Sequence, residues 1–145
     1  MKTILVMIAA GTICFADSER KVKFEELPAA VQSAVKEQSK GATVKSYFKE
    51  VENGKTSYEA EMTVNGHTKD VSFDSTGKVV AVEEETPIDS IPAPAREAIQ
   101  KAAGMGKVNK VEAVTENGKT FYEAAIKTGT KNKEVKFDAA GVPVK

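Results

Sequence analysis

The chain has 145 residues, of which 41% are hydrophobic and 29% are charged, so it can form a folded core and is too apolar for a disordered protein. It carries 21 basic and 21 acidic residues, whereas proteins that bind nucleic acids usually show a basic excess or a basic stripe. It has no tryptophan, which leaves few platforms for stacking bases or sugars. The composition therefore predicts an ordinary globular protein without a nucleic-acid partner.

The N-terminal stretch has the pattern of a secretory signal peptide. Lys2 supplies the positive charge, residues 4–15 form an apolar run too short to span a bilayer, and Ala16 offers a small residue at the cleavage site. We predict a signal peptide at 1–16, cleavage after Ala16, and a periplasmic or secreted mature chain without a transmembrane span. Two alternatives stay open: a lipoprotein signal with Cys14 as the lipidated residue, and an uncleaved buried helix.

Cleavage at this site would remove Cys14, the only cysteine of the chain. The mature protein would then have no disulfide, no thiolate metal site and no cysteine nucleophile. An exported protein of this kind relies on its hydrophobic core for stability.

A helix is predicted after a polar leader at 17–23. Pro28 suits the first turn of a helix, because the missing N–H has no partner there. An apolar stripe then recurs at helical spacing, and Gly41 ends the helix. The stripe consists of Leu27, Val31, Ala34 and Val35, with Gln38 as its polar end.

Four strands of an antiparallel meander follow, and their turns are encoded by short polar pairs. Asn53-Gly54 and Asn65-Gly66 are typical of type I′ hairpin turns, and Asp74 with Gly77 predicts a further turn in which Asp bonds its own backbone. The first strand carries apolar residues on both faces, so a bulge is expected there. The predicted strands are 43–51, 56–64, 69–73 and 78–82.

The same order then restarts, with an offset of 64 residues. Aligned without a gap, residues 24–81 and 88–145 share 18 identities in 58 positions, including the phrase Glu52 to Thr56. The second copy has its helix stripe at 91–102 and its strands at 107–115, 120–127, 133–137 and 142–145. The sequence therefore predicts an α+β fold of two tandem helix-plus-four-strand repeats, at 17–85 and 86–145. The two would form one continuous sheet with both helices on one face.

These residues resemble the PepSY domain and its PepSY-like, beta-lactamase-inhibitor-like relatives. The shared features are a Leu-Pro before a short helix, a Gly-Lys turn before Tyr-Glu, and a Val-x-Phe-Asp-x-x-Gly-x-Val strand and turn. They stand at Leu27, Pro28, Gly54, Tyr58, Glu59, Val71, Phe73, Asp74, Gly77 and Val80, and again at Ile91, Pro92, Gly118, Tyr122, Glu123, Val135, Phe137, Asp138, Gly141 and Val144.

The resemblance implies an exported bacterial protein. PepSY domains also occur in propeptides of secreted metalloproteases, and the inhibitor relatives grip an enzyme with a concave sheet face. An inhibitory or chaperone-like role is therefore implied. This chain differs from those inhibitors in having no disulfide and no tryptophan.

Candidate catalytic and metal-binding residues lack partners in the sequence. His67 is the only histidine and falls in a predicted turn. Asp74 and Asp138 fit turns rather than calcium loops, because calcium needs six or more oxygens. Tyr58 and Tyr122 are expected in the core. We expect 83–85 to be a solvated strand end or linker. No catalytic residue, cofactor site or metal site is predicted.

Five charged residues remain as candidates for binding a partner. Within the repeated phrase, Asn and Gly set the turn and Tyr and Ala face the core, which leaves the charged residues pointing outward. We expect the glutamates to be satisfied by cross-strand lysines. The candidates are Lys55, Glu59, Glu61, Lys119 and Glu123.

The sequence therefore predicts an exported, non-enzymatic PepSY-like binding module. Its open sheet face would modulate or inhibit a secreted or periplasmic enzyme, such as a peptidase or a cell-wall enzyme. The alternatives are a periplasmic carrier that buffers a small ligand or a metal, and a structural protein of the envelope.

Overall fold

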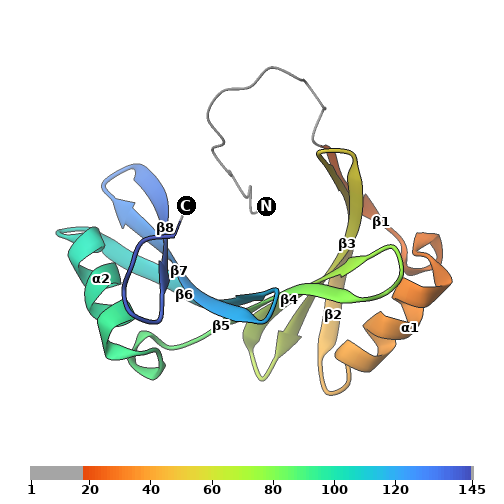
Figure 1. The fold of residues 1–145 in the computed structure, drawn as a ribbon, viewed down its shortest axis with the longest axis horizontal. Helices are drawn as coiled ribbons and strands as arrows, with labels where there is room; N and C mark the ends of the chain where they lie inside the picture. Colours follow the sequence, from red (N-terminus) through yellow and green to blue (C-terminus); the bar gives the residue numbers. More distant parts are fainter. Residues whose placement is uncertain (1–17, 145) are drawn as a thin grey trace.

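The computed structural model describes residues 18–144. The predicted signal peptide, its cleavage after Ala16 and the role of Cys14 lie outside the described residues. One antiparallel sheet of eight strands runs in chain order from β1 to β8, and its two helices lie near the two ends of the curved sheet (Figure 1). The predicted α+β class and the single continuous sheet are thereby confirmed.

The elements of the two repeats follow each other in the same order. The first set is β1 Ser18–Val22, the 3-10 helix η1 Phe24–Glu26, α1 Ala29–Gln38, β2 Thr43–Glu52, β3 Lys55–Val64, β4 His67–Asp74 and β5 Val79–Glu85. The second is the 3-10 helix η2 Ile88–Ser90, α2 Ala93–Ala103, β6 Lys107–Glu116, β7 Lys119–Thr128 and β8 Lys131–Asp138.

Strand β1 corrects the prediction of a polar leader. It pairs with β2 from Ser18 opposite Val51 to Val22 opposite Tyr47, and of its five residues only Val22 is buried. A strand with a single inward apolar residue shows no alternating pattern in the sequence, so the prediction was wrong for a physical reason. The strand adds a fifth member to the first repeat.

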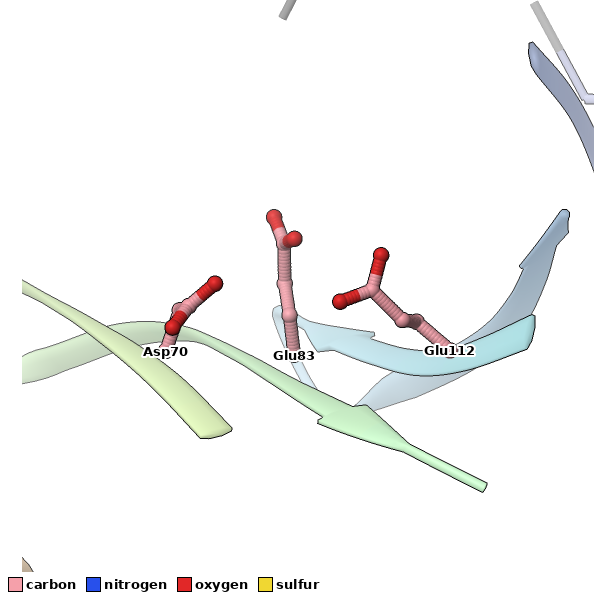
Figure 2. Close-up of side chains that lie close together, drawn as sticks. All are labelled: Asp70, Glu83 and Glu112. Atoms are coloured by element: carbon pink, nitrogen blue, oxygen red, sulfur yellow. The ribbon is translucent and has the colours of Figure 1, made fainter. Parts of the chain in front are cut away.

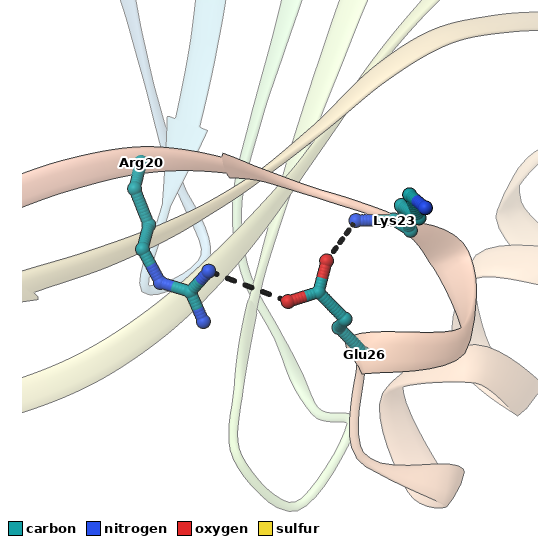
Figure 3. Close-up of polar contacts among 3 residues, drawn as sticks. All are labelled: Arg20, Lys23 and Glu26. Carbon is teal, nitrogen blue, oxygen red and sulfur yellow. Dashed lines mark hydrogen bonds and ion pairs between the residues drawn. The ribbon is translucent and has the colours of Figure 1, made fainter.

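A glutamate holds β1 against the turn that follows it (Figure 3). Glu26 accepts a hydrogen bond from the backbone N–H of Lys23 at 2.8 Å, and its other oxygen lies 3.3 Å from Arg20 Nη1. The bond from the Lys23 backbone, followed by the Arg20 contact, lowers the pKa of this carboxyl. The contact fixes the path of the chain from the sheet edge into α1.

The second repeat lacks a full fourth strand. Residues 142–145 were expected to form it, but the described part makes one isolated bridge, between Phe137 and Pro143. The equivalent of Pro143 in the first repeat is Val79, which begins β5. Proline has no N–H to donate to a strand ladder, and this explains why the two repeats differ here.

The hairpin turns have the predicted chemistry. Asn53 and Gly54 have φ angles of 50° and 75°, and the repeated pair Asn117 and Gly118 has 50° and 74°. A type I′ turn requires positive φ at both central residues, so these turns are confirmed. The predicted bulge is present as a register shift between Val44 and Ser46, and β6 repeats it between Val108 and Lys110.

Each helix packs on the strands of its own repeat. The predicted stripe of α1 is confirmed: Leu27, Val31 and Val35 are buried in the first core. In the second repeat, Ile91, Ala95 and Ile99 take the same places, and Tyr58 and Tyr122 pack against the two cores as expected. The sheet contributes Ala60, Met62, Val71 and Phe73 to the first core and Val111, Ala124, Ile126 and Phe137 to the second.

Two glycines let a sheet turn approach the start of each helix. A Cβ on Gly77 would lie 2.5 Å from the carbonyl oxygen of Ala30, and one on Gly141 would lie 2.6 Å from that of Pro94. Both glycines have positive φ, 82° and 78°. Only glycine meets both demands, so these turns set how closely helix and sheet pack.

Candidate functional site

The five residues predicted to bind a partner lie on one face of the sheet. Glu59 and Glu61 in β3 alternate with the buried Ala60, and Glu123 in β7 precedes the buried Ala124, so their side chains point away from the two cores. Lys55 and Lys119 lie on the same face, at the exposed hairpin ends. We call this surface the carboxylate face.

Three further acidic residues lie at the middle of this face (Figure 2). The sequence alone did not indicate Asp70 and Glu112 as site residues, and it predicted Glu83 only as part of a solvated strand end or linker. Asp70 in β4 is directly opposite Glu83 in β5, and Glu112 comes from β6. One carboxylate oxygen from each lies within 4.8 Å of the others. The signal that could have found them is their alternation with Val71, Val82 and Val111, which turns all three away from the cores.

Glu112 shows how this face can hold an acidic residue away from water. It is only 8% exposed, and its Oε1 forms an ion pair with Lys110 Nζ. A buried carboxylate needs such a partner, because burial without compensation is costly. Both side chains come from β6, two positions apart, so the strand itself places the ammonium beside the carboxylate.

Lys136 in β8 plays a similar part in the second repeat. It is directly opposite Glu123 in the strand register, its ammonium lies 3.4 Å from Glu116 Oε1, and it lies 5.2 Å from the centre of the Phe121 ring. A cation over an aromatic face is stabilised by the ring quadrupole. The carboxylates of the second repeat therefore have lysines built into the sheet beside them.

The first repeat contradicts the expectation of cross-strand lysines. Glu59 lies opposite Phe48 and Ser72, and Glu61 lies opposite Ser46 and Asp70. The prediction was wrong because it assigned no strand register, and a register decides which side chains meet.

The pKa of Glu59 reflects these surroundings. Burial, followed by the nearby carboxylates of Glu50, Asp70, Glu83 and Glu61, raises the pKa of Glu59 from 4.5 to about 8. Burial, followed by the charge of Glu19, also raises the pKa of Glu50. Glu59 is therefore largely protonated at neutral pH, and the first half of the carboxylate face repels further negative charge.

The acidic run 83–85 is more than the predicted solvated strand end. Glu83 belongs to the three-carboxylate group, while Glu84 forms an ion pair with Lys69 at 3.1 Å. Glu85 Oε2 accepts hydrogen bonds from the backbone N–H and the hydroxyl of Thr68, at 3.2 and 3.3 Å. The backbone bond in particular lowers the pKa of Glu85. All three residues lie within β5.

The turn aspartates have the structural role that the sequence predicts. Asp74 Oδ1 accepts hydrogen bonds from the N–H groups of Thr76 and Lys78 at 2.9 and 3.1 Å. Asp138 Oδ1 does the same for Ala140 and Val142, both at 2.9 Å. These bonds close the turns that contact the helices. His67 begins β4 and is exposed, so the predicted turn residue is the first residue of a strand.

The chemistry of the carboxylate face favours positively charged groups. Carboxylate oxygens are ligands that Ca²⁺ accepts, although such an ion takes six to eight oxygens, and they are equally the acceptors that ammonium and guanidinium groups prefer.

A separate hollow of about 450 Å³ lies beside β5 and β6 and is lined by Val79, Val80, Val82 and Thr115, among others. Across residues 18–144, none of the helices is long and apolar enough to cross a membrane.

Comparisons with known proteins agree with this architecture. A BLIP-like protein from Bacteroides fragilis is 22% identical, with 82% of this chain and 84% of that chain covered and a TM-score of 0.60. A DUF2874 family protein from Bacteroides ovatus is 20% identical, with 82% and 85% covered and a TM-score of 0.65. A protein from Bacteroides eggerthii, described as a candidate periplasmic protein, is 18% identical, with 82% and 86% covered and a TM-score of 0.69.

These likenesses show the fold. No curated protein matches the chain. The model of a family described as PepSY-like and as candidate beta-lactamase-inhibitor-like matches twice, at residues 16–78 and 56–143. The two matches agree with the two tandem repeats, and the chain therefore belongs to the PepSY-like family.

Proposed function

We propose that this protein is an exported, non-enzymatic binding module that contacts another exported protein through its carboxylate face. The observation that carries the proposal is a sheet face, remote from both hydrophobic cores, on which half-buried charged side chains from β3 to β8 gather. A protein surface of this kind is unfavourable to maintain without a function, because partly buried carboxylates cost free energy.

The strand registers support an uncovered carboxylate face. Val82 packs with the first core and lies opposite Thr115, which shares its side of β6 with Val111 of the second core. Side chains directly opposite each other point to the same face. These registers support the proposal that both helices lie on one side, and Figure 1 draws them on the outside of the curved sheet. The inside of the curve is left for a partner.

The comparisons lend support of a different kind. The B. fragilis relative is described as BLIP-like, and the B. eggerthii relative as a candidate periplasmic protein. A periplasmic module that holds, and in this way modulates or inhibits, an enzyme fits both descriptions. A peptidase or a cell-wall enzyme is the partner class that we propose.

An affinity capture with matched variants tests the proposal. The protein is purified from the periplasm of cells that express the full chain and is immobilised to capture exported proteins. Glu61→Lys and Glu123→Lys reverse charges on the carboxylate face, whereas Glu37→Lys and Glu97→Lys reverse charges on the exposed sides of α1 and α2. We expect a partner that the first pair of changes releases and the second pair retains. Capture that is insensitive to both pairs, or lost with the helix variants alone, contradicts the proposal.

A further inference from the structure

The two repeats differ in how they neutralise their carboxylates, and two of the differing positions carry a lysine in the second repeat. Aligned at the offset of 64, Lys110 and Lys136 of the second repeat correspond to Ser46 and Ser72 of the first. Both serines are half-buried. They lie on the carboxylate face, because they are directly opposite Glu61 and Glu59 in the strand register. The first repeat therefore has hydroxyls where the second has ammonium groups.

The second repeat shows what such a position holds when a cation is present. Lys110 pairs with Glu112, and Lys136 contacts Glu116 and the Phe121 ring. Their side chains are only 18% and 23% exposed. The backbone of this repeat can therefore seat an ammonium group on the carboxylate face, largely out of water.

The first repeat is the more acidic of the two at these positions. Glu61 corresponds to Ala125 and Glu50 to Val114, whereas Phe48 stands where the second repeat has Glu112. Across these three pairs the first repeat therefore has two carboxylates and the second has one. Burial, followed by the clustering of carboxylates, already raises the pKa of Glu59, because both oppose its ionisation. A cation placed beside Ser46 or Ser72 would relieve that opposition.

We infer that the first repeat binds two cationic side chains, lysine or arginine, of a protein partner at the positions where the second repeat carries its own Lys110 and Lys136. This inference rests on the proposed function and names the chemistry of its partner. Charge complementarity argues for the occupant, and the neutralised second repeat argues for its location on β2 to β5. The partner supplies from outside the charges that the second repeat supplies from its own strands.

The geometry sets the spacing of the two cations. Ser46 lies on β2 and Ser72 on β4, the two strands on either side of β3. Their partners in β3 are two residues apart. From the spacing of strands and of residues along a strand, the two positions lie roughly 12 Å apart. An extended segment with basic residues four apart spans roughly 13 Å, so a single loop or strand of the partner can fill both.

A peptide titration tests the inference. The probe is a blocked five-residue peptide with lysine at both ends and small neutral residues between, and its control is the same peptide with both lysines acetylated. The protein, purified from the periplasm, is followed by NMR. We expect the amide signals of 46, 59, 61 and 72 to shift with the lysine peptide and not with the acetylated one.

Charge transplants provide the second arm. The double variant Ser46→Lys/Ser72→Lys copies the second repeat into the first, so it is expected to fold and to bind the lysine peptide at least about tenfold more weakly. The control Ser33→Lys/Ser75→Lys adds the same charge at exposed positions outside the carboxylate face and should bind as the original protein does. A reverse variant, Lys110→Ser/Lys136→Ser, should gain a second footprint on β6 to β8.

Several results would overturn the inference. These are equal binding of the acetylated peptide, a footprint on the second repeat of the unaltered protein, or unchanged binding by Ser46→Lys/Ser72→Lys. Calcium chloride alone is titrated as well, and an ion that gives the same footprint and excludes the peptide would assign the site to a metal. A captured partner that is sensitive to the carboxylate face but not to the transplant would refute this inference and leave the proposed function standing. If the peptide binds as expected but no protein is captured, the proposed function is refuted and this inference stands.

Discussion

Glu59 offers a direct test of the electrostatics of the carboxylate face, because its replacement by glutamine removes the charge and keeps the shape. Its folded pKa of about 8 lies above the ordinary value of 4.5. Between these two values the folded chain retains a proton that the unfolded chain has lost. The stability that Glu59 contributes is therefore complete below pH 4.5 and is lost as the pH rises through 8.

The size of the effect follows from the interval between the two pKa values. Each pH unit is worth about 1.4 kcal/mol, so ionisation of the unfolded chain between pH 4.5 and pH 7 sets an upper limit of about 3.5 kcal/mol. Solvent screening at a half-buried site reduces this to about 1–2 kcal/mol. We expect Glu59→Gln to match the original protein near pH 4, to exceed its stability by that amount at pH 7, and to gain slightly more at pH 8.5.

Urea unfolding followed by circular dichroism suits this measurement, since the chain has no tryptophan to report by fluorescence. Glu97→Gln, at an exposed position of α2, is the matched control and should show a small difference that does not grow with pH. A Glu59→Gln protein that is equally stable at every pH, or less stable above pH 7, would refute the description of Glu59 as a buried carboxyl among like charges.

Two other predictions concern the turns and the N-terminus. Gly77→Ala should lower the free energy of unfolding by about 2–4 kcal/mol, because the new Cβ meets the Ala30 carbonyl and φ is positive. The control Gly54→Ala has a similar φ but open space around the new Cβ, so it should lower that free energy by about 1 kcal/mol. Equal losses of the two variants in urea unfolding would contradict the packing argument. Expression of the full chain in a bacterium should yield a periplasmic protein that begins at Asp17 by mass spectrometry, whereas a lipid on Cys14 or an intact Met1 would contradict the predicted cleavage.

The parts of the fold that could be predicted are those encoded by local patterns. Asn-Gly pairs set the hairpins, a stripe of four apolar residues set α1, and alternation set most strands, since each depends only on neighbours in sequence. The second repeat carries the same local patterns, so its elements could be predicted from the first. Strand β1 could not be predicted, because Val22 is its only buried residue. The last strand was predicted but does not form fully, because Pro143 interrupts its ladder of hydrogen bonds.

The candidate site could be predicted only in part, because it depends on register. The outward direction of Glu59, Glu61 and Glu123 follows from alternation within one strand. Asp70, Glu83 and Glu112 come together only because β4 pairs with β5 and β5 pairs with β6. The second of these pairings joins the first repeat to the second. The serines that replace two lysines became meaningful only once the register placed them opposite glutamates.

The central claim is that the carboxylate face is the surface at which this protein meets its partner. Photo-crosslinking in living cells tests it most directly, with a photoreactive phenylalanine analogue placed at Ser57 or Thr63 on that face, or at Ser33 or Gln38 on α1. We predict a discrete covalent adduct with an exported protein from the two sheet positions and none from the helix positions. Adducts from the helix positions alone, or no adduct from the carboxylate face in the producing cell, would contradict it.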